Sequence, residues 1–380
     1  MSTDRPDGAV VAVHPHADLY GSDRMFLESV ATLAPGATVV LPKRGPLLTE
    51  LDGRNLSYEV RPFPVLRKVE LRTPWKVFVF LLQFVRSVIV STAWLRSRRT
   101  SVLYVSTVAA PQWLIAGRLS GARVVCHVHE SEPQMSRISS AVLLAPLLAA
   151  HLVIANSEDC LTWITSSLGR RTARRCQVIY NGVREPAPEA VPSTDRASTR
   201  RSVVVVGRLA ARKGQDVAIA ATALVRNAGY DVQLTLVGDG YPGYEDYVDG
   251  LRALAVAEDV GEAIEFVGFQ DPVEYVAAAD VVLVPSRVEP FGLVAVEALL
   301  LGRPVVASRV GGLQEIIEDG RTGLLVDPDD PRALADAIIR LLSDPATATR
   351  LGLAGQADAR ARFSMEAYSA TLSQAVLQRA

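Results

Sequence analysis

Mostly apolar runs of four to six residues recur along this chain with helical stretches between them. In the first half these runs lie at residues 9–13, 37–41, 102–105, 123–128 and 152–155. Strands that are apolar along most of their length are buried on both faces, which is typical of a parallel sheet covered by helices. This alternation constrains the fold more strongly than any other feature of the sequence, and it predicts an α/β domain.

The same alternation restarts in the second half, after a segment rich in proline and polar residues. Apolar runs follow at residues 203–207, 233–238, 264–268, 281–284, 304–307 and 323–326. A chain of 380 residues is also too long for one compact core. We predict two Rossmann-like domains with doubly wound parallel sheets facing each other across a cleft, residues 1–185 and 201–362, joined by a linker at 186–200.

The first strand of the second domain leads into a basic turn. This turn contains Gly207, Arg208 and Lys213, and a helix begins near Gln215. Arg208 can hold a phosphate with its planar fork, Lys213 adds a compact charge, and a helix N-terminus favours the same anion. A solvated basic turn is the alternative. The position favours an anion site, because open α/β sheets bind ligands at the carboxyl ends of their strands.

Two carboxylates frame the stretch Glu-Pro-Phe-Gly-Leu-Val-Ala-Val-Glu, which runs from Glu289 to Glu297 and follows the apolar run Val281–Val284. The pattern predicts a strand, a loop that carries Glu289, and a helix that begins near Gly292 and carries Glu297. Free N–H groups at the start of that helix can bind a phosphate. Each acid alone is compatible with an ordinary helix N-terminus, but the whole stretch indicates a ligand site.

Two candidate residues of the first domain lie at strand ends. Gly21 belongs to a turn of small residues after the first strand, where it can lie against phosphate or sugar, and Ser22 or Asp23 can cap the next helix. His129 follows residues 123–128, and alternation along the strand places it on the same side as His127. A structural hydrogen bond is the more common role for such a histidine. The carboxyl end of the strand favours a functional His129.

Two motif matches have simpler explanations. Residues 238–243 fit the G-x-G-x-x-G pattern of dinucleotide sites, but they do not follow the domain's first strand, and Pro242 interrupts the turn. Asp327, Asp329 and Asp330 precede an amphipathic helix, so N-capping explains them better than a metal. We therefore predict no metal and no cofactor. The three cysteines lack disulfide or metal-ligand spacing and are interpreted as packing residues of a reducing compartment.

Charge is distributed unevenly along the chain. Residues 1–190 carry a net charge of +7 and residues 191–380 a net charge of −8, which suggests that the first half meets an acidic partner. Nine basic residues and one acid lie at 61–99, around a helix predicted from Pro74 to about Leu95. Its uncharged run Val77–Val85 is too short to span a bilayer. The helix is either a core helix flanked by solvated arginines or a peripheral contact with an anionic membrane surface.

As a set, the motifs of the second half resemble those of glycosyltransferase family 4, a large group of retaining enzymes with the GT-B fold. The resemblance covers most of the chain and is strongest between residues 203 and 327. It rests on Gly207-Arg208-Leu209 with Arg212-Lys213-Gly214, Val237-Gly238-Asp239-Gly240, Phe266-Val267-Gly268, the E-x7-E signature from Glu289 to Glu297, Val310–Glu315 and Gly320–Gly323. One departure is Gly21-Ser22, where many members have two glycines.

The resemblance implies roles for individual residues. Arg208 and Lys213 would neutralise the donor diphosphate and stabilise the departing nucleoside diphosphate, while Glu289 would contact the transferred sugar. Glu297 would hold the ribose hydroxyls. Further contacts to the donor would come from Gly21, Gly207, His129, Phe291, Gly292 and Leu293, and from the backbone around Phe269, which would read the base. Residues 363–380 would form a helix that returns to the first domain.

The activity that the resemblance implies is retaining, metal-independent transfer of a sugar from a nucleotide diphosphate sugar to a glycan or lipid-linked acceptor, in cell-surface glycan or glycolipid biosynthesis. The N-terminus lacks the basic and apolar regions of a signal peptide, so we expect a cytoplasmic protein, peripheral at the inner face of the membrane. We expect no nucleic-acid partner. A nucleotide-sugar-binding protein without transfer activity and a sugar-nucleotide epimerase of the same fold are the alternatives.

Overall fold

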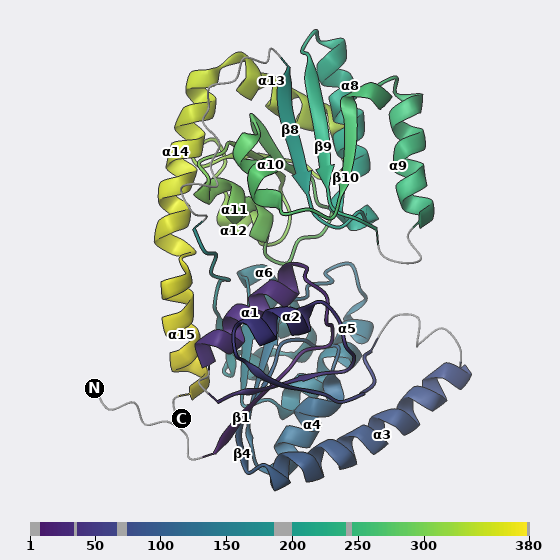
Figure 1. Ribbon diagram of the computed structural model, residues 1–380, viewed down its shortest axis with the longest axis vertical. Helices are drawn as coiled ribbons and strands as arrows, with labels where there is room; N and C mark the ends of the chain where they lie inside the picture. Colours follow the sequence, from purple (N-terminus) through teal and green to yellow (C-terminus); the bar gives the residue numbers. More distant parts are fainter. Residues whose placement is uncertain (1–7, 34–35, 67–73, 186–199, 241–244, 378–380) are drawn as a thin grey trace. The chain divides into compact units, whose positions relative to one another are not determined.

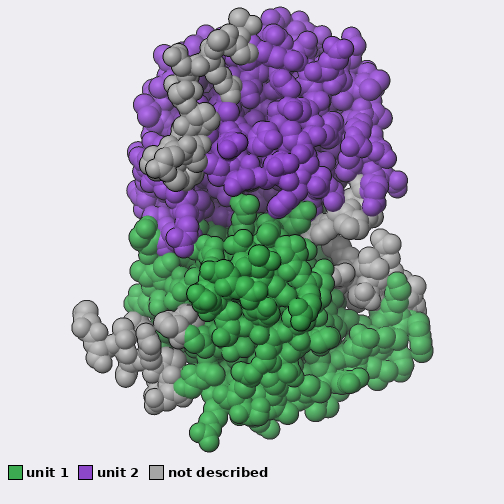
Figure 2. Space-filling model, viewed as in Figure 1, with its two compact units in different colours: residues 1–182, 366–380 green, residues 183–365 purple. Residues whose placement is uncertain are grey.

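The computed structural model describes residues 8–33, 36–66, 74–185, 200–240 and 245–377. The chain divides into two compact units, residues 1–182 with 366–380 and residues 183–365 (Figure 2). Each unit is built on one parallel β-sheet, so the predicted pair of doubly wound α/β domains is confirmed. The predicted linker lies outside the described residues except for its last residue, Arg200.

Unit 1 contains a seven-stranded sheet in the order β3-β2-β1-β4-β5-β6-β7, and every pairing between neighbouring strands is parallel. The strands are β1 (Ala9–Val13), β2 (Thr38–Leu41), β3 (Ser57–Val60), β4 (Thr100–Val105), β5 (Arg123–Val128), β6 (Leu152–Ala155) and β7 (Cys176–Val178). The chain moves outward from β1 in one direction and from β4 in the other. The order therefore reverses between β1 and β4, where doubly wound sheets bind ligands.

Helices cover this sheet and contribute the apolar faces that bury it (Figure 1). They are α1 (Gly21–Leu33), α2 (Leu47–Gly53), α3 (Pro74–Ser97), α4 (Pro111–Ser120), α5 (Arg137–Leu144), α6 (Glu158–Leu168), α7 (Arg170–Ala173) and α15 (Met365–Leu377). Trp113 of α4 is the largest fully buried side chain, and the core extends to Leu103 and Val124 of the sheet. The final helix joins this unit, where the Tyr368 hydroxyl lies 2.6 Å from Ser29 Oγ of α1.

Unit 2 contains a six-stranded parallel sheet in the order β10-β9-β8-β11-β12-β13. Its strands are β8 (Arg201–Val206), β9 (Val232–Val237), β10 (Ile264–Gly268), β11 (Val281–Val284), β12 (Val305–Ser308) and β13 (Leu324–Val326). Its helices are α8 (Gln215–Asn227), α9 (Glu245–Ala257), α10 (Pro272–Ala278), α11 (Leu293–Leu300), α12 (Leu313–Ile316), α13 (Pro331–Ser343) and α14 (Pro345–Arg362). The order reverses between β8 and β11.

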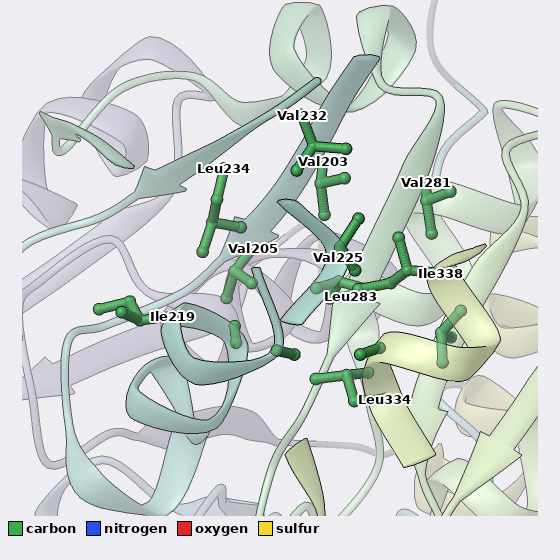
Figure 3. Close-up of a cluster of buried hydrophobic side chains, with 14 of the residues drawn as sticks. Val203, Val205, Ile219, Val225, Val232, Leu234, Val281, Leu283, Leu334 and Ile338 are labelled. Carbon is green, nitrogen blue, oxygen red and sulfur yellow. The ribbon is translucent and has the colours of Figure 1, made fainter. Parts of the chain in front are cut away.

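Aliphatic side chains fill the space between this sheet and the helices of one face. Figure 3 shows Val203 and Val205 of β8 with Leu283 of β11 beside Ile219 of α8 and Leu334 of α13, all of them buried. The N-terminus of α13 is capped by Asp330, whose carboxylate accepts hydrogen bonds from the N–H groups of Arg332 and Ala333. The N-capping interpretation of this aspartate is confirmed.

Helix α3 differs from the prediction made for it. The helix was expected, and it ends two residues later than predicted, at Ser97. Within the described residues it is long and apolar enough to cross a membrane by length and composition alone, over residues 75–97, and 17% of its apolar window is buried. The prediction that this helix is too short to span a bilayer counted only the uncharged run Val77–Val85. It was wrong by length and composition, because apolar residues continue beyond Arg86.

Candidate functional site

The best-defined site of unit 2 lies where its strand order reverses. Strands β8 and β11 are neighbours, with Val205 paired to Leu283. The chain leaves β8 through Gly207 and Arg208, and it leaves β11 through the loop that carries Glu289. Because parallel strands end at the same edge of a sheet, the basic turn and the acidic loop lie side by side.

Lys213 and Glu289 join these two loops directly. Lys213 Nζ lies 2.5 Å from Glu289 Oε2, which also accepts a hydrogen bond of 3.1 Å from Ser286 Oγ. The two side chains are 16% and 10% exposed, respectively. Lys213 ends a short 3-10 segment, Ala211–Lys213, and the Arg208 carbonyl accepts a 2.8 Å hydrogen bond from the Gln215 side chain. The sequence identified both residues of this ion pair but not the contact between them.

Burial and neighbouring charges act in opposite directions on the carboxylate of this pair. Burial alone raises the pKa of Glu289, but Lys213 and Arg212 together with the Ser286 hydrogen bond hold that pKa below its ordinary value. Burial lowers the pKa of Lys213, and the attraction of Glu289 opposes part of this shift. The lowered pKa keeps Glu289 a carboxylate at neutral pH, and the basic residues Arg208, Arg212 and Lys213 lie close to one another beside it.

A glycine allows the basic turn to approach the neighbouring strand. Gly214 adopts φ +68°, and a Cβ at this position would lie 2.0 Å from the Pro285 carbonyl oxygen. Only glycine satisfies both conditions without displacement of the backbone. The turn is therefore held against the end of β11, which positions Lys213 beside Glu289.

Helix α11 begins directly after Gly292, as predicted. Its first turn is set by the Gly292 carbonyl, which accepts hydrogen bonds from the N–H groups of Ala295 and Val296. The Phe291 ring is buried and packs edge-on against the Phe363 ring, with 5.7 Å between the ring centroids. Only the backbone of Phe291 can therefore meet a ligand. Leu293 and Glu297 are partly exposed in the first two turns.

Phe269 lies at the end of β10, on the other side of β8 from Glu289. Its N–H donates a 3.0 Å hydrogen bond to Asp239 Oδ2, and its ring is 47% exposed. Asp239 in turn follows β9, and its carbonyl accepts a hydrogen bond from Leu209 of the basic turn. These contacts tie the ends of three strands together and fix Phe269 relative to Arg208. The G-x-G-x-x-G match begins at this turn, but residues 241–244 lie outside the described residues.

Arg287 is a structural residue of the site that the sequence did not reveal. Its guanidinium binds both oxygens of Asp216, at 2.9 and 2.7 Å, and Asp329 Oδ1 at 2.5 Å. These hydrogen bonds raise the pKa of Arg287 further above its ordinary value. The network fastens the start of α8 to the loop after β11. No local motif marks it, because the Asp216 and Arg287 partners are 71 residues apart.

In unit 1, His14 connects the two strands at the reversal of the sheet. His14 Nδ1 lies 2.6 Å from Ser106 Oγ, after β4, and His14 Nε2 lies 2.7 Å from Asp23 Oδ1 in α1. All three are buried. Burial alone raises the pKa of Asp23, but His14 and the Tyr20 N–H hold it below the ordinary value.

The predicted Gly21 loop forms the start of α1. Gly21 is the first residue of the helix and is exposed. Asp23 reaches back to the N–H of Tyr20 at 2.9 Å, which is one half of a capping box. Ser22 is exposed as well. The capping interpretation therefore holds for Asp23, and the turn leaves Gly21 accessible.

His129 is held neutral in a largely buried position after β5. Its ring lies 4.1 Å from that of His127, centroid to centroid. Burial and the nearby His14 lower the pKa of His129 to about 3. His129 Nε2 is buried, and it has no hydrogen-bond partner among the residues that the structure describes. Beside it, Glu130 accepts hydrogen bonds from the Thr107 hydroxyl and the His129 N–H, and burial raises its pKa.

Within the described ranges, one group of side chains has donor atoms close enough to share a metal ion, namely His14, His16 and Asp23. The prediction of no metal was made without regard to this group. Both ring nitrogens of His14 already lie at hydrogen-bond distance from Ser106 and Asp23. A metal would therefore have to replace an existing hydrogen bond.

Comparisons with known proteins identify the family of this chain. The pattern of the family described as glycosyl transferases group 1 matches residues 187–358, and that of glycosyltransferase family 4 matches residues 37–185. The chain belongs to the group 1 glycosyltransferases. The first match contains all the candidate residues of unit 2, and the second contains His129.

Relatives of this chain include proteins of Corynebacterium glutamicum. It is 41% identical over 197 residues to the D-inositol 3-phosphate glycosyltransferase of strain R, which covers 48% of the chain and 47% of that protein. The chain thus spans about half the length of this relative. It is 29% identical over 347 residues to a GDP-mannose-dependent monoacylated alpha-(1-6)-phosphatidylinositol monomannoside mannosyltransferase, which covers 82% of each chain.

Solved structures show the same fold. Anabaena HepE, crystallised in complex with UDP and glucose, matches this chain with a TM-score of 0.81 and 26% identity, over 97% of this chain and 98% of HepE. The likeness over nearly the whole chain confirms the predicted GT-B fold, which consists of two Rossmann-like units.

Proposed function

We propose that this group 1 glycosyltransferase transfers a sugar from a nucleotide diphosphate sugar to a glycan or lipid-linked acceptor, with retention of configuration and without a metal ion. The acceptor class places the enzyme in cell-surface glycan or glycolipid biosynthesis. The observation that carries the proposal is the buried Lys213–Glu289 pair, which lies beside Arg208 where the sheet of unit 2 reverses. A donor with a charged diphosphate and a neutral sugar matches these cations and this carboxylate.

Charge decides how the diphosphate binds. When the bond to the anomeric carbon breaks, negative charge grows on the leaving diphosphate and must be stabilised. Arg208 offers a planar fork, and Lys213 carries three N–H donors, of which one is directed at Glu289. Lys213 can therefore keep its ion pair while it binds a phosphate oxygen. The N–H groups at the start of α11 add further donors without an added cation.

Glu289 and Glu297 would contact the two ends of the donor. Glu289 is fixed by Lys213 and Ser286, which leaves its second oxygen to accept hydrogen bonds from sugar hydroxyls. Glu297 lies about one turn into α11 and would bind the ribose hydroxyls. The exposed ring and the carbonyl of Phe269 would meet the base, because the Phe269 N–H is already bonded to Asp239.

Retention follows from front-face attack in this proposal. The leaving phosphate oxygen would take the proton of the acceptor hydroxyl, so that no protein nucleophile is required. Neutral His129 would supply a hydrogen bond near the transferred sugar through Nε2, and Gly21 would lie against phosphate or acceptor. The UDP and glucose bound to HepE and the GDP-mannose dependence of the mannosyltransferase relative define the first donors to test.

The test is a product analysis with UDP-glucose and GDP-mannose, each with and without an inositol phosphate or phosphatidylinositol acceptor. We expect nucleoside diphosphate and an α-configured product only when the acceptor is present, with the same rate in EDTA. Epimerised donor without acceptor would identify an epimerase. Tight donor binding with no turnover on any acceptor would favour the binding-protein alternative, and an inverted product would refute retention.

A further inference from the structure

Helix α3 presents a row of apolar side chains to solvent. Of the 14 large hydrophobic residues that are exposed in the described chain, half lie on this helix, between 48% and 70% exposed. They are Trp75, Phe78, Leu81, Leu82, Val85, Ile89 and Val90. Five of them recur at spacings of three or four residues, Trp75, Phe78, Leu82, Val85 and Ile89, so they share one face of the helix. An exposed apolar surface of this kind marks an interaction site.

The carboxyl-terminal third of α3 is buried more deeply than the rest of the helix. Ser91, Thr92 and Leu95 are buried, and the Trp94 ring lies 6.0 Å from that of Trp113 in the core. The guanidinium groups of Arg61 and Arg98 each lie 4.7 Å from the Trp94 ring. Figure 1 shows the amino-terminal part of α3 extending beyond the other helices of unit 1. The buried carboxyl-terminal third of α3 thus holds the apolar face in place.

Charge on α3 is exclusively positive. Residues 74–97 contain Lys76, Arg86 and Arg96 and no acid, and all three basic residues are exposed. Arg86 lies within the apolar face, between Val85 and Ile89. The half of the chain that carries the helix has a net charge of +7. An apolar face studded with cations complements an anionic lipid surface, where arginine meets the headgroups and aromatic rings lie at the boundary with the acyl chains.

We propose that α3 binds unit 1 to an anionic bilayer by lying in the plane of its surface. The exposed segment, Trp75–Val90, has 16 residues and spans about 24 Å at 1.5 Å per residue. A hydrocarbon core of about 30 Å is thicker than this. Because the remaining turns are packed in unit 1 and Arg86 interrupts the apolar surface, the helix lies along the membrane and does not cross it.

A second copy of the chain is a less suitable occupant. Self-association through this face would bury Arg86 from both copies, and the helix has no acid with which to pair it. Leaving a charge buried and unpaired is costly. A lipid surface supplies the missing anions as phosphate groups, which the arginine fork binds well.

The experiment is vesicle flotation of the full chain with phosphatidylcholine vesicles and with phosphatidylcholine–phosphatidylglycerol vesicles. We expect recovery with the anionic vesicles and at least about tenfold weaker binding for Phe78→Glu/Leu82→Glu, a loss of about 1.4 kcal/mol at the tenfold limit. Arg86→Glu should weaken binding to anionic vesicles selectively. The matched control is Val256→Glu/Leu353→Glu, which alters exposed apolar residues of unit 2 and should bind like the parent.

Three results would overturn the proposal. These are equal recovery of the parent with and without vesicles, unchanged binding of Phe78→Glu/Leu82→Glu, and an equal loss in the control. A dimer in light scattering that only the α3 variant disrupts would assign the face to self-association instead. All substituted positions are exposed, and thermal unfolding checks that the variants fold. Lipid binding does not depend on the proposed transfer reaction, and stabilisation by UDP or GDP tests donor binding separately.

Discussion

Substitution Lys213→Met isolates the energetics of the buried ion pair. Glu289 is 8% exposed, and the Ser286 hydroxyl would still donate a hydrogen bond to it once the ammonium is removed. Breaking a buried pair by removal of one partner costs about 3–5 kcal/mol. The side chains keep some exposure, so we expect about 3 kcal/mol, at the lower end of this range. Glu289→Gln on the Lys213→Met background removes the stranded charge and should restore about 2 kcal/mol.

The pH dependence gives this prediction a sign. In the parent, the pKa of Glu289 is below its ordinary value, so its stabilising contribution is lost only as pH falls through the acidic range below about 4.5. In Lys213→Met, burial is the largest remaining influence and raises the pKa of Glu289. A raised carboxyl pKa stabilises the fold as pH falls, so the deficit of the variant should shrink from pH 7 to pH 5.5.

The assay is urea unfolding combined with hydrogen exchange of peptides from β8 and β11, which reports unit 2 separately from unit 1. Parent, Lys213→Met, Glu289→Gln and the double variant form a double-mutant cycle. If the double variant is no more stable than Lys213→Met, and if the deficit does not change with pH, then Glu289 is not a charge that Lys213 stabilises, and the reasoning fails.

Three other predictions follow from the same geometry. Arg208→Ala should weaken UDP or GDP binding by about 10- to 100-fold in calorimetry, because charge-assisted hydrogen bonds contribute about 1.5–3 kcal/mol, with little change in thermal stability; unchanged affinity would remove Arg208 from the phosphate site. Gly214→Ala should destabilise unit 2 by more than about 2 kcal/mol, because the positive φ and the contact with Pro285 both disfavour a Cβ at this position. The control Gly53→Ala, in helix α2 with open space around it, should be neutral or stabilising. Equal unfolding midpoints of the two variants would contradict this prediction. His129 has a pKa of about 3 in the fold, so its contribution to the free energy of unfolding should fall by about 1.4 kcal/mol per pH unit as pH falls below about 6.5. The free energy of unfolding of His129→Gln, measured with urea at pH 7, 6 and 5, should therefore depend less steeply on pH than that of the parent. Identical slopes would show that His129 is not buried as a neutral ring.

The sequence located every strand of unit 2 and the five central strands of unit 1, but not the two edge strands of the unit 1 sheet. Strands at residues 9–13, 123–128, 152–155, 264–268 and 281–284 have the predicted bounds. The two outer strands of unit 1, Ser57–Val60 and Cys176–Val178, were not predicted. Both are short and have exposed or half-buried side chains, because an edge strand is covered less than a central one. The apolar pattern from which strands were recognised is therefore weakest at the two edges of the unit 1 sheet.

Contacts between loops depend on strand order, which the local pattern does not specify. The sequence identified Lys213 and Glu289 as separate motifs 76 residues apart, and the placement of β8 next to β11 makes them a pair. The same holds for His14 and Ser106, which are 92 residues apart and meet because β1 lies next to β4. Residue types at strand ends could thus be predicted, but their hydrogen-bond partners required the topology.

The two reversal points show how a common fold is given different chemistry. In unit 1, the loops after β1 and β4 are joined by buried His14 and Ser106, and in unit 2 the loops after β8 and β11 are joined by a charged pair. Residues 191–380 have a net charge of −8, yet the six residues from Arg208 to Lys213 contain three cations and no acid. A negatively charged surround disfavours binding of anions elsewhere on this half, while the cations attract them to one strand end. In the proposed function, the local reversal of sign, more than the presence of basic residues, would make this turn a selective site for a diphosphate.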